Sequence, residues 1–290
     1  MLPNAVRNGR QANTALPNLV VIGAKKAGTT SLYHYLDSHP DISMSREKEL
    51  DFFVAERNWP RGPGWYRRHF NADVAVRGEA SPYYTALPTH RGVPARMANV
   101  VPEARLIYVV RDPIERLVSH YHMAIATGRE RRPLRAAVAD FSESWYVAHG
   151  RYWMQLEPYL RRFAPEQVLV VDQDDLARNR RAELRRVFRF LGVDADFVSP
   201  DFDEVHFTAM ARRRRGPVAK AILALDEAIG NDRSYHVRRR VPGWIRTMLS
   251  APLERPALEP ALRARLGQLY APEVARLREH TGLRFASWSV

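Results

Sequence analysis

The sequence contains no cysteine among its 290 residues, and only four of its 45 basic residues are lysine. Without cysteine the chain can form neither disulfide bonds nor thiolate metal sites, so cysteine usage does not indicate a redox compartment. No stretch approaches the ~18 consecutive apolar residues of a membrane span, and the N-terminal residues lack the apolar core of a signal peptide. These absences predict a soluble, cytoplasmic protein without a membrane span.

What the chain has in excess is arginine, which occurs 41 times and gives a formal net charge of +13. Such a charge favours an anionic partner, whether nucleic acid, a membrane surface, a phosphorylated cofactor or an acidic substrate. Against this background Lys25, Lys26 and Lys48 fall in two short segments. An ammonium is a compact point charge and a guanidinium a planar fork. We interpret these positions as ones that need the compact cation.

Short apolar runs alternate with helical patterns along the first two thirds of the chain. The runs at 18–23, 104–113 and 166–176 have the profile of buried parallel strands, and a shorter strand is expected within 76–84. This alternation predicts an α/β fold with a central parallel sheet flanked by helices and ligands at the carboxyl ends of its strands. We expect a flexible segment over 1–17 and a single domain over 18–290 whose C-terminal part is helical and arginine-rich.

The first predicted strand leads into "GAKKAGTTS", a loop with the glycine spacing of the G-x-x-x-x-G-K-[ST] phosphate loop but with Thr29 in place of its lysine. Backbone amides, three hydroxyls and the Lys26 ammonium meet here at the start of a helix, which suits an anion. A tight turn capped by Thr29 would explain the glycine and threonines, but not two adjacent lysines. We predict an anion site with Lys25 at its outer rim or in solvent, formed by Lys26, Ala27, Gly28, Thr29, Thr30 and Ser31.

The segment "SREKELDFF", residues 45–53, follows the first helix closely and should lie near the same end of the sheet. Phe52 and Phe53 can anchor it in the core and hold Glu49 at a cleft, where a carboxylate can serve as general base. An ordinary solvated Lys48–Glu49 pair is the alternative.

In "VVRDPIERLVSHYHM", residues 109–123, Arg111 stands at the end of a strand and Ser119 two helical turns later, so both could contact one phosphate. Pairing of Arg111 with a nearby carboxylate is the alternative. His120 and His122 face different sides of a helix, and no H-E-x-x-H pattern occurs, so no metal site is expected.

Together these segments resemble the sulfotransferases that use 3′-phosphoadenosine-5′-phosphosulfate (PAPS), in particular the heparan-sulfate-type N- and 3-O-sulfotransferase branch. "IGAKKAGTTSLYHYLDSHPDI" is similar to the 5′-phosphosulfate loop of that branch, "KELDFF" to its catalytic-glutamate segment and "YVVRDPIERLVSHY" to its 3′-phosphate segment. The resemblance implies a P-loop-like architecture, PAPS as donor, adenosine 3′,5′-bisphosphate as product and no metal. It also implies that Lys26 and the Gly28–Ser31 turn hold the 5′-phosphosulfate, Glu49 is the base, and Arg111 and Ser119 bind the 3′-phosphate.

Two departures from that branch concern the acceptor and the nucleotide. Ala80 stands where 3-O-sulfotransferases commonly have a lysine, which weakens the expectation of the same polysaccharide acceptor. The family's lysine-glycine-arginine loop has no clear copy. Arg213 and Arg214, within "ARRRRG" at 211–216, are expected to contact the nucleotide phosphates in its place, although a solvated basic run fits equally. Lys48 and Glu79 are expected on the acceptor side, with Glu79 as the second candidate for the base.

The altered loop is consistent with sulfuryl transfer, because a sulfuryl group carries less charge than a phosphoryl group and needs no magnesium clamp. The acceptor is expected to be a hydroxyl or amine of a glycan-like, anionic or small molecule. Two alternatives remain open. One is a metal-dependent nucleotide or small-molecule kinase with Asp112 and Asp172 as magnesium ligands. The other is a non-enzymatic nucleic-acid binder, which would explain the charge but not the lysines at the loop.

Overall fold

The structure is a computed structural model that describes residues 15–204, 213–215 and 250–290. Its contacts divide the chain into two compact units. The sheet unit contains the described residues up to 110 together with 155–204, and the helical unit contains 111–154 with the described C-terminal segments. Most of the expected flexible segment, 1–17, lies outside the described residues, and the single domain over 18–290 stays a prediction.

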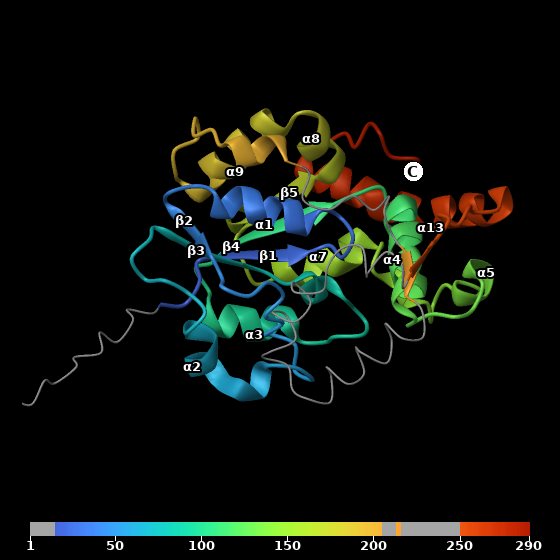
Figure 1. The fold of residues 1–290 in the computed structure, drawn as a ribbon, viewed down its shortest axis with the longest axis horizontal. Helices are drawn as coiled ribbons and strands as arrows, with labels where there is room; N and C mark the ends of the chain where they lie inside the picture. The colour runs from blue at the N-terminus through green and yellow to red at the C-terminus, as the bar shows by residue number, and fades with distance from the viewer. Residues whose placement is uncertain (1–14, 205–212, 216–249) are drawn as a thin grey trace, which may run out of the picture. The chain divides into compact units, whose positions relative to one another are not determined.

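The sheet unit is built around five parallel strands in the order β2-β3-β1-β4-β5 (Figure 1). The strands are β1 (Leu19–Gly23), β2 (Ile42–Met44), β3 (Val76–Ala80), β4 (Arg105–Val110) and β5 (Val168–Asp172). β1 lies between β3 and β4, and its residue Val21 is in register with Ala80 and Ile107. Because β1 is covered on both sides by neighbouring strands and helices, all five of its residues are buried. The predicted central parallel sheet is confirmed.

Helices cover both faces of this sheet. α1 (Thr29–Asp37), α8 (Gln173–Arg178) and α9 (Arg180–Leu191) lie on one side, and α3 (Val93–Val100) lies on the other, with α2 (Gly62–Arg67) beyond it (Figure 1). The chain leaves β1 towards β2 at one edge and later leaves β3 towards β4 in the opposite direction. Since parallel crossovers are right-handed, α1 and α3 must then fall on opposite faces. In open parallel sheets ligands bind where the strand order reverses, so this topology predicts a ligand site at the carboxyl ends of β1 and its neighbours.

The three predicted buried strands are confirmed as β1, β4 and β5, and the short strand within 76–84 as β3 followed by a 3₁₀ turn at Pro82–Thr85. After β5, Asn179 separates α8 from α9, and α9 ends at Gly192, which has a φ of 72°. β2 was not predicted, because a strand of three residues is too short to show a recognisable pattern of apolar and polar residues.

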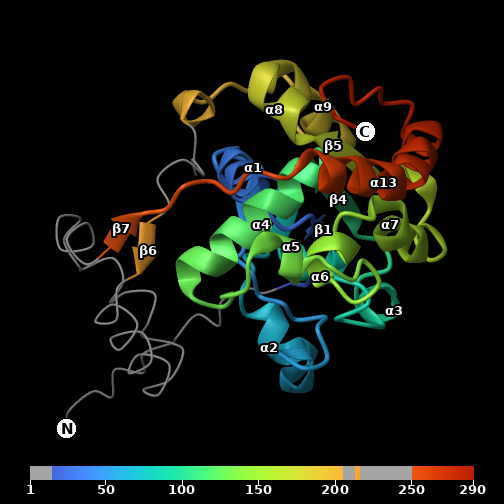
Figure 2. The same ribbon diagram turned by 90° about the vertical axis from the view of Figure 1, so that its right-hand side faces the viewer.

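The helical unit is formed by α4 (Pro113–Thr127), α5 (Leu134–Ala137), α6 (Trp145–Ala148), the first residues of α7 (Tyr152–Leu160) and α13 (Pro260–Thr281). Its core joins apolar side chains of α4, α6 and α13, among them Leu117, Tyr146 and Tyr270. The C-terminal part, which was expected to be helical, contains α13, but Arg213–Arg215 form a strand, β6, which pairs antiparallel with β7 (Ser250–Pro252) (Figure 2). Residues 205–212 and 216–249 lie outside the described residues.

Candidate active site

The backbone conformation of the loop between β1 and α1 depends on two glycines, Gly23 and Gly28. A Cβ atom at Gly23 would lie 1.9 Å from Thr85 Oγ1, so only glycine lets the strand end pass this close to the neighbouring turn. Gly28 has a φ of 95° and directly precedes α1. Lys26 also has a left-handed φ, of 74°, which is uncommon for a residue with a side chain and marks a backbone held by its surroundings.

The N-terminus of α1 is open to an anion. No side chain caps it, and its first turn contains no acidic residue. The first amides of a helix have no partner within the helix, and the helix dipole favours negative charge at this end. Of the predicted anion-site residues, Thr29, Thr30 and Ser31 begin α1, Gly28 directly precedes the helix, and Lys26 lies three residues before Thr29.

Glu49 is tied to the same edge of the sheet. The segment after β2 continues alongside β3, since Ser45 N donates to Gly78 O at 2.7 Å and Glu49 N donates to Ala80 O at 3.2 Å. Ala80 ends β3 and is in register with Val21 of β1. Glu49 and the Lys26 loop thus both stand at the carboxyl ends of two adjacent strands. The Glu49 side chain is 47% exposed and pairs with Lys48 at 3.2 Å.

The aromatic pair that follows Glu49 anchors the segment as the sequence predicts. Phe52 and Phe53 are fully buried, and Phe52 stacks on Tyr66 with ring centroids 4.2 Å apart. Glu49 itself has a φ of 66° and Asp51 a φ of 46°. Two left-handed residues so close together turn the chain sharply, so that the carboxylate of Glu49 stays in solvent while the next residues enter the core.

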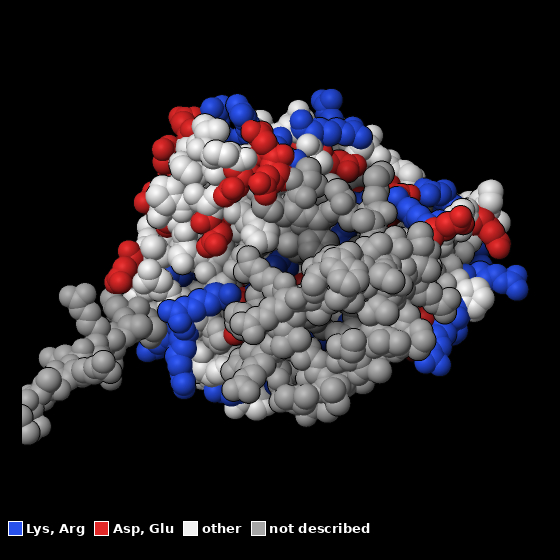
Figure 3. Space-filling model, viewed as in Figure 1, with Lys and Arg blue, Asp and Glu red and all other residues white. Residues whose placement is uncertain are grey.

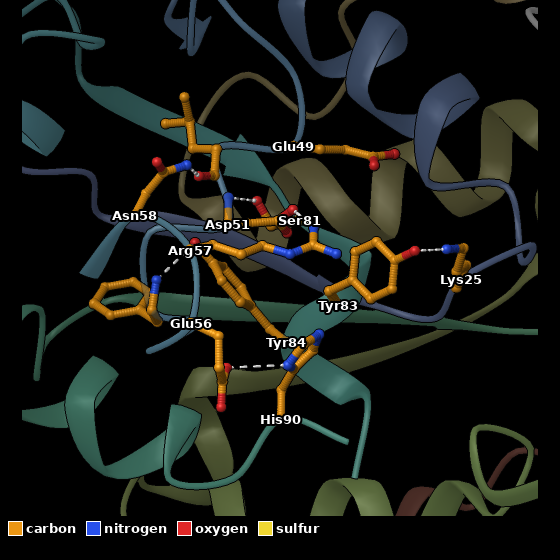
Figure 4. Close-up of polar contacts among 12 residues, drawn as sticks. Lys25, Glu49, Asp51, Glu56, Arg57, Asn58, Ser81, Tyr83, Tyr84 and His90 are labelled. Carbon is orange, nitrogen blue, oxygen red and sulfur yellow. Dashed lines mark hydrogen bonds and ion pairs between the residues drawn. The ribbon is translucent and has the colours of Figure 1, made fainter. Parts of the chain in front are cut away.

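Sequence reasoning missed a row of polar residues beside Glu49 (Figure 4). Lys25 Nζ donates to the Tyr83 hydroxyl and lies 3.7 Å from the centroid of that ring, so Lys25 packs against Tyr83 and does not simply extend into solvent, which was one of its two expected positions. Its position at the outer rim of the anion site stays a prediction. The Arg57 guanidinium lies 4.1 Å from the same ring and donates to Asp51. Burial raises the pKa of Asp51 to about 6, although Arg57 opposes the shift and Glu49 adds to it. Only a three-dimensional structure could reveal this row, because its members are spread from residue 25 to residue 83.

Glu79 is fully buried, and its environment differs from what the sequence suggested. Its carboxylate accepts hydrogen bonds from the hydroxyls of Tyr66 at 2.6 Å, Tyr84 at 2.7 Å and Ser81 at 2.6 Å. Burial raises the pKa of Glu79 to about 7, and the three hydroxyl donors oppose that shift. A carboxylate enclosed in this way argues against direct contact with an acceptor and against a role as the general base.

We expect Glu79→Gln to remove part of the pH dependence of folding. The pKa of Glu79 in the folded protein, about 7, lies above its ordinary value of 4.5, so between these values the folded state holds more protons than the unfolded state. The free energy of unfolding therefore falls as pH rises through this window, by roughly 3 kcal/mol. Urea unfolding at pH 5 and pH 8 should show a smaller fall for Glu79→Gln than for the parent. Exposed Glu103→Gln is the control, and parallel profiles for all three proteins would contradict the expectation.

The residues predicted for the 3′-phosphate belong to the helical unit. Arg111 precedes α4, and its carbonyl accepts a hydrogen bond of 2.6 Å from the Tyr152 hydroxyl. Ser119 lies buried in α4, two turns along. Arg213 and Arg214 lie in β6, opposite Pro252 and Ala251 of β7. The phosphate contacts of all four residues stay predictions.

The kinase alternative loses support, because both of its predicted magnesium ligands cap helices. Asp112 Oδ1 accepts hydrogen bonds from the amides of Ile114 and Glu115 at the start of α4. Asp172 Oδ1 accepts one from the amide of Asp174 at the start of α8. Within the described ranges, no group of three or more His, Asp or Glu side chains could hold a metal ion, and no helix could span a membrane.

The surface of the sheet unit carries both signs of charge. Figure 3 shows acidic side chains among basic ones over the region of α1, α8 and α9. Arg185 pairs with Asp196 at 2.9 Å, and Arg186 pairs with Glu183 within α9. A continuous basic surface, which a nucleic-acid binder would use to neutralise phosphates, is not formed on this part of the described surface.

Comparison with known proteins agrees with the geometry at the sheet edge. A family model described as a sulfotransferase domain matches residues 16–269. The chain belongs to the sulfotransferase family. Among relatives of this sulfotransferase, mouse heparan sulfate glucosamine 3-O-sulfotransferase 3A1 is 33% identical over 198 residues, which are 63% of this chain and 47% of the mouse protein. Human heparan sulfate glucosamine 3-O-sulfotransferase 6 is 28% identical over 292 residues, 98% of this chain and 76% of the human protein.

The crystal structure of a sulfotransferase from Alicyclobacillus acidocaldarius has the same fold as this sulfotransferase. It superimposes with a TM-score of 0.68 at 27% identity, and the match covers 95% of this chain and 100% of that one. The chain spans about half the length of the mouse 3A1 and 3B1 proteins, 47% and 46%. The sulfotransferase family that the motifs predicted is confirmed, and heparan sulfate 3-O-sulfotransferases, of the branch that the motifs resemble, are among the relatives of the chain.

Proposed function

We propose that this sulfotransferase moves a sulfuryl group from PAPS to a hydroxyl or amine, with Glu49 as general base and Lys26 at the leaving phosphate. One observation carries the proposal. Lys26 and Glu49 both have left-handed backbones, and they stand at the carboxyl ends of the adjacent strands β1 and β3. Strain of this kind persists where the surrounding structure fixes a residue, and it concentrates at functional sites.

In the proposed reaction the acceptor oxygen or nitrogen attacks sulfur and forms a new bond to it. The bond between sulfur and the bridging oxygen of the 5′-phosphate breaks in line, and that oxygen keeps the electron pair. Glu49 takes the acceptor proton, and adenosine 3′,5′-bisphosphate leaves. Negative charge grows on the leaving phosphate, where the ammonium of Lys26 and the first amides of α1 can stabilise it without rearrangement.

The remaining cofactor contacts extend the proposal to both phosphates. Ala27 and the Gly28–Ser31 turn would enclose the 5′-phosphosulfate, and Arg111 and Ser119 would bind the 3′-phosphate. Arg213 and Arg214 are further candidates for the nucleotide phosphates. The donor set around Lys26 consists of amides, hydroxyls and an ammonium, which suits an anion held without a metal ion.

For the acceptor we propose a glycan or other anionic molecule, because relatives at 28–34% identity are named heparan sulfate glucosamine 3-O-sulfotransferases. The Ala80 departure means that the sugar need not be the same. Lys48 pairs with Glu49 at 3.2 Å, and this supports the proposal that it contacts the acceptor beside the base. A cytoplasmic location stays a prediction.

We expect adenosine 3′,5′-bisphosphate to stabilise the protein against heat in the presence of EDTA. A ligand that binds only the folded state at 100 times its Kd adds about 2.7 kcal/mol to the free energy of unfolding, which for a chain of this size raises Tm by roughly 5 °C. AMP, which lacks the 3′-phosphate, should raise Tm less. Thermal unfolding followed by circular dichroism measures both shifts.

Arg111→Ala tests the 3′-phosphate assignment in the same experiment. It should reduce the shift given by adenosine 3′,5′-bisphosphate to that given by AMP and leave the AMP shift unchanged. Equal stabilisation of the parent protein by both nucleotides would argue against a 3′-phosphate site. A shift that requires magnesium would instead favour the kinase alternative.

A further inference from the structure

A row of four contacting side chains, Asp51, Arg57, Tyr83 and Lys25, lies beside Glu49, and the proposed transfer step uses none of them. In Figure 4 the Arg57 side chain lies between Asp51 and Tyr83, and Lys25 meets the hydroxyl end of the Tyr83 ring. All four belong to the sheet unit. The row begins two residues after the proposed base and includes a residue of the loop that carries Lys26. It therefore borders the position where an acceptor must approach Glu49.

Asp51 fixes the position of this row. Its side chain is only 6% exposed, and its amide donates to Ser81 Oγ at 2.9 Å. One carboxylate oxygen accepts a hydrogen bond from Arg57, while the other, Oδ1, is buried with no hydrogen-bond partner. A buried carboxylate is costly without a paired cation, so Asp51 holds the guanidinium of Arg57 strongly in place.

The side chain of Arg57 is partly exposed to solvent, although Asp51 and Tyr83 hold it in position. It is 37% exposed, and it contacts Asp51 and Tyr83, to whose side chain it is also hydrogen-bonded. A guanidinium has five N–H donors in a planar fork that matches the oxygens of a carboxylate or sulfate. Its hydrogen bonds to Asp51 and Tyr83 still leave N–H donors for a ligand, in an orientation already fixed.

The charges around Arg57 also favour an anion. Lys25 shares the Tyr83 ring with Arg57, and Lys48 pairs with Glu49. Of the carboxylates nearby, Glu49 pairs with Lys48, Asp51 with Arg57 and Glu56 with His90. Two cations, Lys25 and Arg57, therefore meet at one aromatic ring, which favours an anion there.

We infer that Arg57 binds an anionic group of the acceptor, a carboxylate or a sulfate, and that Asp51 is the positioning residue that holds Arg57 for this contact. The inference rests on the proposed function, because it assumes that an acceptor approaches Glu49. Arg57 would then determine acceptor specificity, although it has no role in donor binding or in proton transfer.

The test measures binding of a heparin-type hexasaccharide by isothermal titration calorimetry, with the protein saturated in adenosine 3′,5′-bisphosphate. Its carboxyl-reduced and fully desulfated forms distinguish a carboxylate from a sulfate as the bound group. Arg57→Gln should weaken binding of the parent hexasaccharide by about 10- to 100-fold, the effect of losing hydrogen bonds to a charged group. For the modified hexasaccharide that lacks the anion bound by Arg57, the Arg57→Gln variant and the unaltered protein should have the same affinity.

Two further variants separate recognition from a merely structural role. Arg61→Gln removes an exposed arginine that stacks on Trp65 instead, and it should bind all three forms like the parent protein. Asp51→Asn should reduce the preference for the parent hexasaccharide over the form that lacks the recognised anion, because Arg57 keeps its charge but loses the carboxylate that holds it. Arg57→Lys should also reduce this preference in part. Unchanged affinity for adenosine 3′,5′-bisphosphate in each variant shows that the site has folded.

The inference is overturned if Arg57→Gln binds the parent hexasaccharide within threefold of the unaltered protein. It is also overturned if the unaltered protein binds the three forms equally, or binds none of them. Failure of the unaltered protein to bind adenosine 3′,5′-bisphosphate would instead count against the proposed function, so the two failures can be told apart.

Discussion

Replacing Glu49 by glutamine is expected to slow sulfuryl transfer by about 10²- to 10⁴-fold, the usual contribution of a general base. The amide has the shape of the carboxylate but cannot take the acceptor proton, so adenosine 3′,5′-bisphosphate should bind nearly as it does to the parent protein. Glu49 is held by its backbone amide on Ala80 and its side chain is 47% exposed, so the change disturbs no buried contact. Single-turnover transfer from labelled PAPS to an acceptor found by product mass measures the effect.

The matched control is Glu47→Gln, which neutralises another exposed carboxylate of the same segment. It should transfer at the parent rate. If Glu49→Gln also kept that rate while chemistry limits turnover, the base would have to lie elsewhere. Glu79 would then be a poor replacement, because three hydroxyls enclose its carboxylate.

Lys26→Arg is expected to lose much of what Lys26→Ala loses, on the order of 10²- to 10³-fold in the rate of transfer. The substitution keeps the charge, and arginine is the residue this chain uses 41 times elsewhere. If Lys26 delivers a compact ammonium to an oxygen between sulfur and the leaving phosphate, the broader guanidinium misplaces its donors. Single-turnover rates with each variant saturated in PAPS separate the chemical step from binding and release.

Lys25→Arg is the control within the same loop. Lys25 donates to the Tyr83 hydroxyl, and an arginine can make the same contact, so its effect on the transfer step should be mild. A Lys26→Arg protein that transfers at the parent rate would leave only a requirement for positive charge and would refute the geometric argument.

Local patterns in the sequence carried the prediction of the sheet and of the loop. Apolar runs that end in glycine or in a polar residue indicated β1, β4 and β5, because parallel strands that are buried on both faces consist almost entirely of apolar residues. Gly28 and its threonines marked the start of α1, and Phe52 and Phe53 marked the entry of the Glu49 segment into the core. Each of these signals lies within a few residues of the element it predicts.

The sequence could not show what depends on distant contacts. Glu79 looks like any carboxylate in "GEASPYY", and only the approach of Tyr66 from α2 reveals that it is enclosed. Arg57 and Asp51 are six residues apart, yet their role depends on Tyr83. β2 is defined by its pairing with β3 more than by its own three residues.

The buried carboxylate of Glu79 also has a consequence for how this sequence can drift. Tyr66, Ser81 and Tyr84 each give it one hydroxyl hydrogen bond, and loss of any one hydroxyl leaves a buried carboxyl group with one donor fewer. Loss of the carboxylate alone leaves the three hydroxyls without their acceptor. A single substitution at any of these four positions is therefore expected to lower the stability of the fold. Stability is restored either by reversing that substitution or by replacing all four residues together.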